Sequence, residues 1–179
     1  MKRVVSAIMM MFLLASVYGA AVIWHLQTEN SSVSFNIKNF GKKVEGTFGG
    51  MKADIKFDEK NPEQSRFSAS IQVKTIDTGN KKRDKDLMGE KYFDAEKYPL
   101  IEFKSKSVSK TSNGYLAKGD LSIKGTVREA DIPFTFEKKG DQGEFVGTLS
   151  LNRHDYSIGG NTKIMGDQVE IRIKAEVNK

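Results

Sequence analysis

The chain changes its pattern once, at RDKDLMGEKYFD (residues 83–94), and a new alternating segment opens at YPLIEFKS (98–105). On both sides of this stretch apolar residues recur at every second position, which is typical of β-strands with one buried face. Within the stretch that period is lost. Asn80 has a side chain suited to a helix N-cap, and Gly89 is a residue that commonly ends a helix. A short helical crossover is therefore predicted between two groups of strands.

Eight alternating segments flank the crossover and make the predicted fold class all-β. They run over residues 33–37, 44–57, 67–73, 101–105, 115–123, 128–136, 145–151 and 169–177. The second segment changes phase across Gly49-Gly50, where a bulge or a sharp bend is expected. Most connections are short and polar, as between antiparallel neighbours. The sequence therefore predicts one domain, an eight-stranded antiparallel barrel, because closure removes exposed sheet edges.

Large and small residues alternate along the inward faces of these strands. The small ones are Gly46, Ala69, Ser105, Ala117, Gly119 and Gly147, and the large ones include Phe57, Phe67, Phe134, Phe136 and Phe145. Eight strands enclose a space that side chains either fill or leave open for one small ligand. Small inward residues favour open volume, but glycines also permit tight coiling at barrel corners. The sequence leaves both alternatives open.

Residues 1–21 have the organisation of a secretory signal peptide. Lys2 and Arg3 give a positive start, an apolar run follows, and small residues come at positions 19–21. A membrane anchor would need about 20 apolar residues, more than this run provides. We therefore expect cleavage at the end of this segment, a mature barrel domain at 22–179 and a periplasmic location, with secretion beyond the envelope left open. The absence of cysteine agrees with an envelope space where disulfides are optional.

Composition argues against several function classes. With no cysteine and only His25 and His154, a metal site is not expected. The net charge of +6 includes the two basic residues of the leader, and the remaining excess is spread over many strand faces. Nucleic-acid binding would require a concentrated basic stripe, and the one compact cluster, residues 81–85, contains Asp84. No nucleic-acid partner is expected, whereas transient contact with an anionic membrane surface is left open.

Two charged pairs are candidates for a special role. His154-Asp155 is the only constellation that suggests catalysis, but a triad needs an activated serine and no nucleophile-elbow pattern is present. We therefore predict that the protein is not an enzyme and has no catalytic residues. Arg83 and Asp84 are interpreted as residues that hold the crossover in place, because surface charge usually has no other task.

Three blocks of the chain resemble the YceI-like polyisoprenoid-binding proteins of bacterial envelopes. The first lies within residues 76–105 and includes IDT, RD, YFD and PLIEFKS, the second is GDLSIKGTVR at 119–128, and the third is NRHDY at 152–156. They occur in the family's order, and the resemblance covers essentially the whole mature chain. Asp86 departs from it, because the family commonly has a histidine there, and Ser157 stands where a glycine is frequent.

The resemblance implies a lipocalin-like barrel whose apolar tunnel holds a long-chain isoprenoid lipid or an isoprenoid quinone, for transport or storage, with no other cofactor. Along this tunnel we expect Phe35, Ile37, Phe48, Ile71, Phe103, Leu121, Ile123, Leu149, Leu151, Ile171 and Ile173, with Leu87 and Phe93 closing it. For any one of these residues, filling the core is the simpler role. The alternative function is an envelope stress or structural protein that acts through partners and has a filled barrel. A homodimer is compatible with either function.

Overall fold

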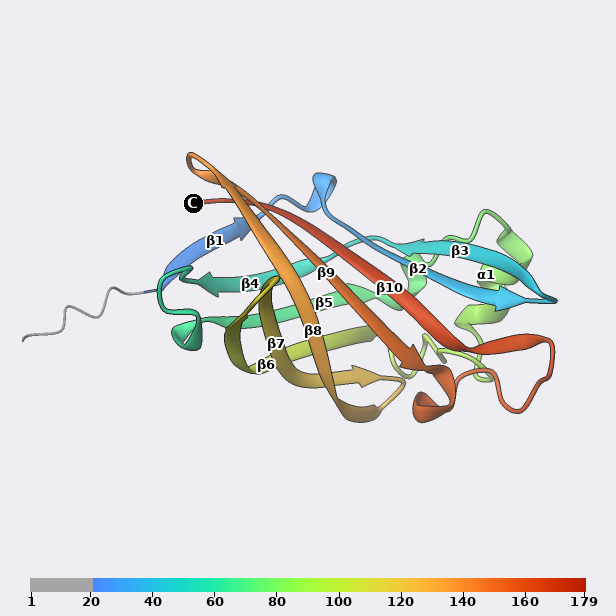
Figure 1. Ribbon diagram of the computed structural model, residues 1–179. Helices are drawn as coiled ribbons and strands as arrows, with labels where there is room; N and C mark the ends of the chain where they lie inside the picture. The colour runs from blue at the N-terminus through green and yellow to red at the C-terminus, as the bar shows by residue number, and fades with distance from the viewer. Residues whose placement is uncertain (1–20) are drawn as a thin grey trace, which may run out of the picture.

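The computed structural model describes residues 21–179 (Figure 1), so the predicted signal peptide lies outside the described residues except for its last position. Ten strands form one antiparallel sheet: β1 (Val22–Leu26), β2 (Ser32–Asn39), β3 (Lys42–Phe48), β4 (Lys52–Phe57), β5 (Arg66–Gln72), β6 (Leu100–Thr111), β7 (Gly114–Ile123), β8 (Thr126–Lys139), β9 (Gln142–Asn152) and β10 (Met165–Asn178). The helical elements are α1 (Lys81–Met88) and four 3-10 turns, η1 (Thr28–Asn30), η2 (Pro62–Gln64), η3 (Val73–Thr75) and η4 (Arg153–Tyr156).

The sheet closes into a ring of eight strands. Their order is β1-β4-β5-β6-β7-β8-β9-β10, and β10 pairs back onto β1. At this seam His25 pairs with Asn178 and Leu26 pairs with Val177. The predicted all-β fold, an eight-stranded antiparallel barrel with one short helix in the crossover, is therefore confirmed.

The structure departs from the prediction at the first two of the eight segments. The second is split into β3 and β4 at Gly49-Gly50, where Gly50 has a φ of +63° and provides the expected bend. The first is preceded by β1, which η1 separates from β2 and which the sequence analysis missed. Only Trp24 is fully buried on β1, and a five-residue strand with one buried position shows too little alternation to be recognised.

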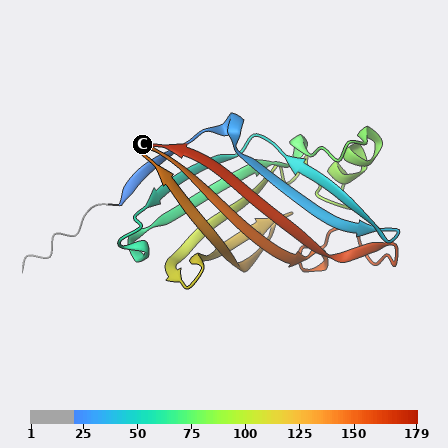
Figure 2. The same ribbon diagram turned by 45° about the horizontal axis from the view of Figure 1, so that its top comes forward.

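The hairpin of β2 and β3 extends beyond the ring (Figure 1). Along its length β3 pairs only with β2, and one bridge, between Thr47 and Asp77, joins it to the crossover. Helix α1 lies at this same end of the molecule, while the C-terminus and β1 lie at the opposite end (Figure 2). The two ends of the barrel are therefore bordered by different elements: α1 and the β2–β3 hairpin at one, β1 and the C-terminus at the other.

The crossover is fixed by hydrogen bonds around Thr78. As predicted, the Asn80 side chain caps α1 by accepting from the Arg83 backbone N–H at 3.1 Å, and Gly89 follows the last helical residue. The Arg83 guanidinium donates to the Thr78 hydroxyl and carbonyl oxygens, both at 2.8 Å. The Asp84 carboxylate accepts from the Thr78 N–H at 2.9 Å and from its hydroxyl at 2.6 Å. Arg83 and Asp84 thus hold the crossover, as expected, but through Thr78.

The end of the barrel that contains β1 and β4 is packed with aromatic side chains. Phe57 is 1% exposed, and its ring centroid lies 5.0 to 6.0 Å from those of five others. Trp24 packs edge-on against Phe136, and its indole N–H donates to the Phe57 carbonyl at 3.3 Å. We call this cluster the aromatic plug; its members are Trp24, Phe57, Phe67, Tyr115, Phe134, Phe136 and Phe145. The plug fills this end of the barrel.

Candidate functional site

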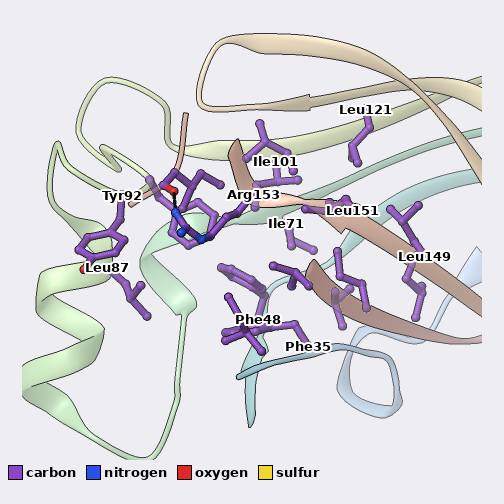
Figure 3. A pocket seen from close by; sticks show the side chains of 18 of the residues that line it. Phe35, Phe48, Ile71, Leu87, Tyr92, Ile101, Leu121, Leu149, Leu151 and Arg153 are labelled. Atoms are coloured by element: carbon purple, nitrogen blue, oxygen red, sulfur yellow. Dashed lines mark hydrogen bonds between the residues drawn. The ribbon is translucent and has the colours of Figure 1, made fainter. Parts of the chain in front are cut away.

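An apolar cavity occupies the other end of the barrel, toward α1 (Figure 3). The volume open to the centre of a water molecule is about 190 Å³. Its walls come from β2, β3 and β5 to β10, together with the crossover, η4 and the loop after it. No member of the aromatic plug lines it. The cavity is therefore blind, with a mouth at the α1 end and a filled barrel beneath it, and the expected tunnel does not run through the barrel.

All thirteen residues predicted for the tunnel lie on the wall of this single cavity. They are Phe35, Ile37, Phe48, Ile71, Leu87, Phe93, Phe103, Leu121, Ile123, Leu149, Leu151, Ile171 and Ile173. For the eleven that lie on strands, the period-2 pattern correctly assigned the inward face; Leu87 and Phe93 come from the crossover. That they bind a ligand stays a prediction.

The cavity is long rather than round. Along β2 it is lined from Val33 to Asn39, a span of about 20 Å at the usual rise of a strand. The Phe48 ring packs against Phe35 at a tilt of 39° and meets Phe93 edge-on, with ring centroids 5.4 and 5.7 Å away. These contacts join the hairpin to the crossover, so that α1 and the residues after it form one side of the cavity.

The small inward residues do not keep the cavity open. Of the six, only Ala69 lines it. A Cβ on Gly46 would lie 2.5 Å from the Phe35 ring, and one on Gly119 would lie 2.2 Å from the Lys104 carbonyl oxygen. Gly119 faces a β-bulge between Ser105 and Ser107, where the two strands approach closely. Tight coiling, the second of the two sequence-based alternatives, is the role of this glycine.

Arg153 is a wall residue that the sequence analysis missed. It is 1% exposed, and its five N–H groups all have partners. They donate to the carbonyl oxygens of Ile158, Gly160, Met165 and Gly166 and to the carboxylate of Asp167, at 2.7 to 3.4 Å. The loop 157–167 is therefore fixed against the cavity by a single buried side chain. The only signal was its place in the third family block, NRHDY at 152–156.

His154 and Asp155 do not form a catalytic pair. His154 Nε2 lies 2.8 Å from Asp167, whereas the Asp155 backbone carbonyl accepts from Arg128 at 2.8 Å. In the hydrogen bonds of residues 21–179, no serine hydroxyl contacts either side chain. His154 instead supports the same Asp167 carboxylate that Arg153 binds.

Few polar groups face the cavity, and three of them are already engaged. The lining residues with polar groups on their side chains are Asn39, Ser70, Thr78, Arg83, Tyr92, Glu102 and Arg153. Thr78, Arg83 and Arg153 hold the crossover and the loop 157–167, and Glu102 is exposed at the surface. In the described part of the chain, no three His, Cys, Asp or Glu side chains gather as metal ligands, and no helix has the length and apolarity to cross a membrane. Chemically, the cavity is suited to a hydrocarbon chain.

Related sequences include a domain-family profile and several UPF0312 proteins. The profile of the YceI-like domain matches residues 24–177. A UPF0312 protein of Yersinia pestis is 25% identical over 178 residues, covering 93% of this chain and 91% of the relative. A UPF0312 protein of Photorhabdus laumondii is 33% identical over 101 residues, which span 56% of this chain and about half (53%) of the relative's length.

Solved structures show the same fold. BcnA of Burkholderia cenocepacia superposes with a TM-score of 0.80 at 29% identity, covering 86% of this chain and 99% of that one. The YceI protein of Campylobacter jejuni gives 0.69 at 26% identity over 77% and 86% of the two chains. A polyisoprenoid-binding domain from Saccharophagus degradans gives 0.69 at 10% identity over 89% and 99%, a likeness of fold. Because the family profile covers almost the whole described chain, this protein belongs to the YceI-like domain family.

Proposed function

We propose that the cavity binds a long-chain isoprenoid lipid or isoprenoid quinone without catalysis, for transport or storage in the bacterial envelope. The observation that carries this proposal is the shape of the site: a long, blind and almost wholly apolar cavity beside a packed plug. The Saccharophagus degradans domain of the same fold is described as polyisoprenoid-binding, which adds support. The leader pattern of residues 1–21 supports the periplasm as the compartment.

Burial of the chain supplies enough free energy for binding. Each methylene removed from water contributes about 0.8 kcal/mol. Several isoprene units therefore gain more than about 10 kcal/mol, before the cost of ordering the chain and the wall is subtracted. The headgroup remains at the mouth, near Asn39 and Glu102. Discrimination between headgroups is expected to be weak, because the residues that face the cavity offer mostly hydrocarbon.

The open volume also weighs against the alternative, a filled barrel that acts only through partners. Only the end that contains the aromatic plug is packed throughout. A homodimer or a membrane contact is compatible with the proposed function, since both would leave the cavity available.

Direct extraction tests the proposal. The exported protein is purified from the periplasm of a bacterium that makes polyprenyl lipids and extracted with organic solvent, and prenyl lipid per protein is measured by mass spectrometry. We expect about one lipid per folded protein. Val169→Trp, on the cavity wall of β10, should remove most of it because the indole occupies the site.

Arg172→Trp is the matched control. It places the same side chain on the outer face of the same strand, where Arg172 is exposed, and it should retain the lipid. Thermal unfolding of both variants checks that each is folded. Wild-type protein that is folded and yet yields no prenyl lipid would count against the proposed function, and equal lipid in both variants would exclude this cavity as the site.

A further inference from the structure

Two large apolar side chains project into solvent at the open end of the barrel. Phe40, in the turn between β2 and β3, is 71% exposed, and Ile164, in the loop before β10, is 48% exposed. The Phe40 N–H donates to the Ile164 carbonyl at 2.7 Å. Figure 1 shows this turn and this loop side by side, at the end farthest from the C-terminus. The two side chains therefore belong to one surface.

The local backbone conformation does not explain why a phenylalanine occupies position 40. Phe40 and Gly41 are the central residues of a two-residue hairpin turn, with φ values of +49° and +72°. Turns with two positive φ values favour Asn-Gly, and an aromatic residue at the first position is strained. Since Phe40 is also mostly exposed, it contributes little to the core. A residue that conflicts with its local conformation without a packing gain indicates a functional role.

Three lysines surround these apolar side chains. Lys38, Lys42 and Lys163 are exposed, and none of them is in an ion pair within residues 21–179. The nearby Lys43 is neutralised by Glu45 at 2.6 Å. Asp167, the acidic residue that shares a surface hollow with Lys38 and Lys163, is held by Arg153 and His154. We call Lys38, Phe40, Lys42, Lys163 and Ile164 the rim patch; it combines exposed hydrocarbon with unpaired positive charge.

The rim patch adjoins the mouth of the cavity. Asn39, next to Phe40, and Met165, next to Ile164, both line the cavity wall. We propose that the rim patch docks on an anionic phospholipid surface, with Phe40 and Ile164 inserted among the headgroups and the lysines beside lipid phosphates. This inference rests on the proposed function, because it would place the mouth of a lipid-binding cavity against the bilayer that supplies or receives the lipid.

The composition of the patch favours a membrane over a protein partner. Two apolar side chains at the tips of loops provide far less than the roughly 800 Å² per partner of a stable protein interface. Aromatic and aliphatic side chains flanked by lysine are typical of segments that lie in the membrane interface. Each lysine near an anionic leaflet adds attraction that salt weakens.

Vesicle flotation tests the docking surface. The exported protein is mixed with vesicles of phosphatidylethanolamine and phosphatidylglycerol, or of phosphatidylcholine alone. We expect binding to the anionic vesicles that weakens with salt and is nearly absent on phosphatidylcholine. Replacing Lys38, Lys42 and Lys163 together by Glu should reduce the affinity by about 100-fold or more. Phe40→Asn combined with Ile164→Ser should reduce it roughly tenfold.

Matched controls come from the opposite end of the barrel. Lys60, Lys110 and Lys139 are exposed, and their replacement by Glu changes the net charge equally. Ile23, which is 56% exposed on β1, is the control for Ile164. Both controls should bind vesicles as the wild type does. Phe40→Asn alone suits the turn and should raise the unfolding midpoint by roughly 1–3 °C, so that lost docking cannot be ascribed to misfolding.

The outcomes separate this inference from the proposed function. Rim-patch variants should retain the prenyl lipid in the extraction assay while they lose vesicle binding. Failure of the wild type to float with anionic vesicles, or equal binding by rim and control variants, would overturn the docking surface and leave the extraction result as it stands. Absence of extractable lipid with intact docking would overturn the proposed function alone.

Discussion

The two ends of the barrel share strands β5, β7, β8 and β9 but differ in their other strands and in the side chains that occupy them: β1 and β4 contribute only to the filled end, and the β2–β3 hairpin only to the hollow end. At one end seven aromatic residues, the aromatic plug, interlock around Phe57. At the other, mostly aliphatic residues stand along the wall and leave a cavity, which the crossover and the loop 157–167 border. The comparison teaches that one end of the barrel supplies the packed core and the other supplies open volume. The filled end is stabilised by aromatic packing, and the hollow end by polar contacts around Thr78 and Arg153.

The largest effect should come from truncating one buried residue at each end. Phe57→Ala is expected to lower the free energy of unfolding by about 3–5 kcal/mol, because the ring is fully packed. Ile171→Ala, on the cavity wall, should cost only about 1–2 kcal/mol, since part of that side chain already faces empty space. Urea unfolding of lipid-free protein measures both. Equal losses at the two positions would contradict the difference in packing between the two ends.

Enlarging an alanine at each end should give a smaller difference. Ala117 is buried beside the plug, so Ala117→Leu is expected to destabilise the protein by about 1–3 kcal/mol through overpacking. Ala69 lines the cavity, and Ala69→Leu should change stability by less than about 0.5 kcal/mol. The same unfolding experiment compares them, and a large loss for Ala69→Leu would show that the cavity wall has no room.

The smallest effect is expected for the stability of the crossover at low pH. The pKa of the Asp84 carboxyl lies below its usual value, mainly because the Thr78 hydroxyl donates to it. A carboxyl with a lowered folded pKa stabilises the fold above its unfolded pKa, about 3.9, and this contribution is lost as the pH falls through the folded value. Protection of the amides of residues 78–99 against exchange, relative to their intrinsic rates, should therefore fall below about pH 4, and Asp84→Asn should flatten that dependence.

Asp58 provides the control for this prediction at the filled end. Its pKa is also lowered, chiefly by a hydrogen bond from Asn61. Asp58→Asn should leave the acid response of the crossover unchanged. If both substitutions flatten exchange at residues 78–99 alike, the effect is global and does not belong to the hollow end.

The sequence predicted seven of the eight ring strands, the helix and the eleven wall residues that lie on strands, because each depends on local period or on capping. It placed Phe57, Phe67 and Phe134 on inward faces as well, but gave no sign that they gather at one end. Depth along the axis depends on how neighbouring strands are staggered, and the pairing of Ala69 with Phe103 or of Phe134 with Gly147 is a tertiary property. A blind cavity and a through-going tunnel therefore look alike in the sequence.

Arg153 was missed for a different reason. A charged residue at the end of a strand is usually exposed, and only its partners make burial acceptable. Four of its five partners are backbone carbonyls of residues 158–166, which carry no side-chain signal, and the fifth is the carboxylate of Asp167. For Gly46 and Gly119 the sequence could not decide between open space and a close approach, since a missing side chain permits either. The structure shows a close approach at both.

The aromatic plug has a consequence for how a ligand would exchange. Under the proposed function, a lipid chain that enters past α1 would meet the plug and would have to leave through the same opening, headgroup first. Loading and unloading would then exclude each other in time. The protein would carry its ligand from one site to another rather than form a conduit between two compartments, and the rate of exchange would be set at one opening.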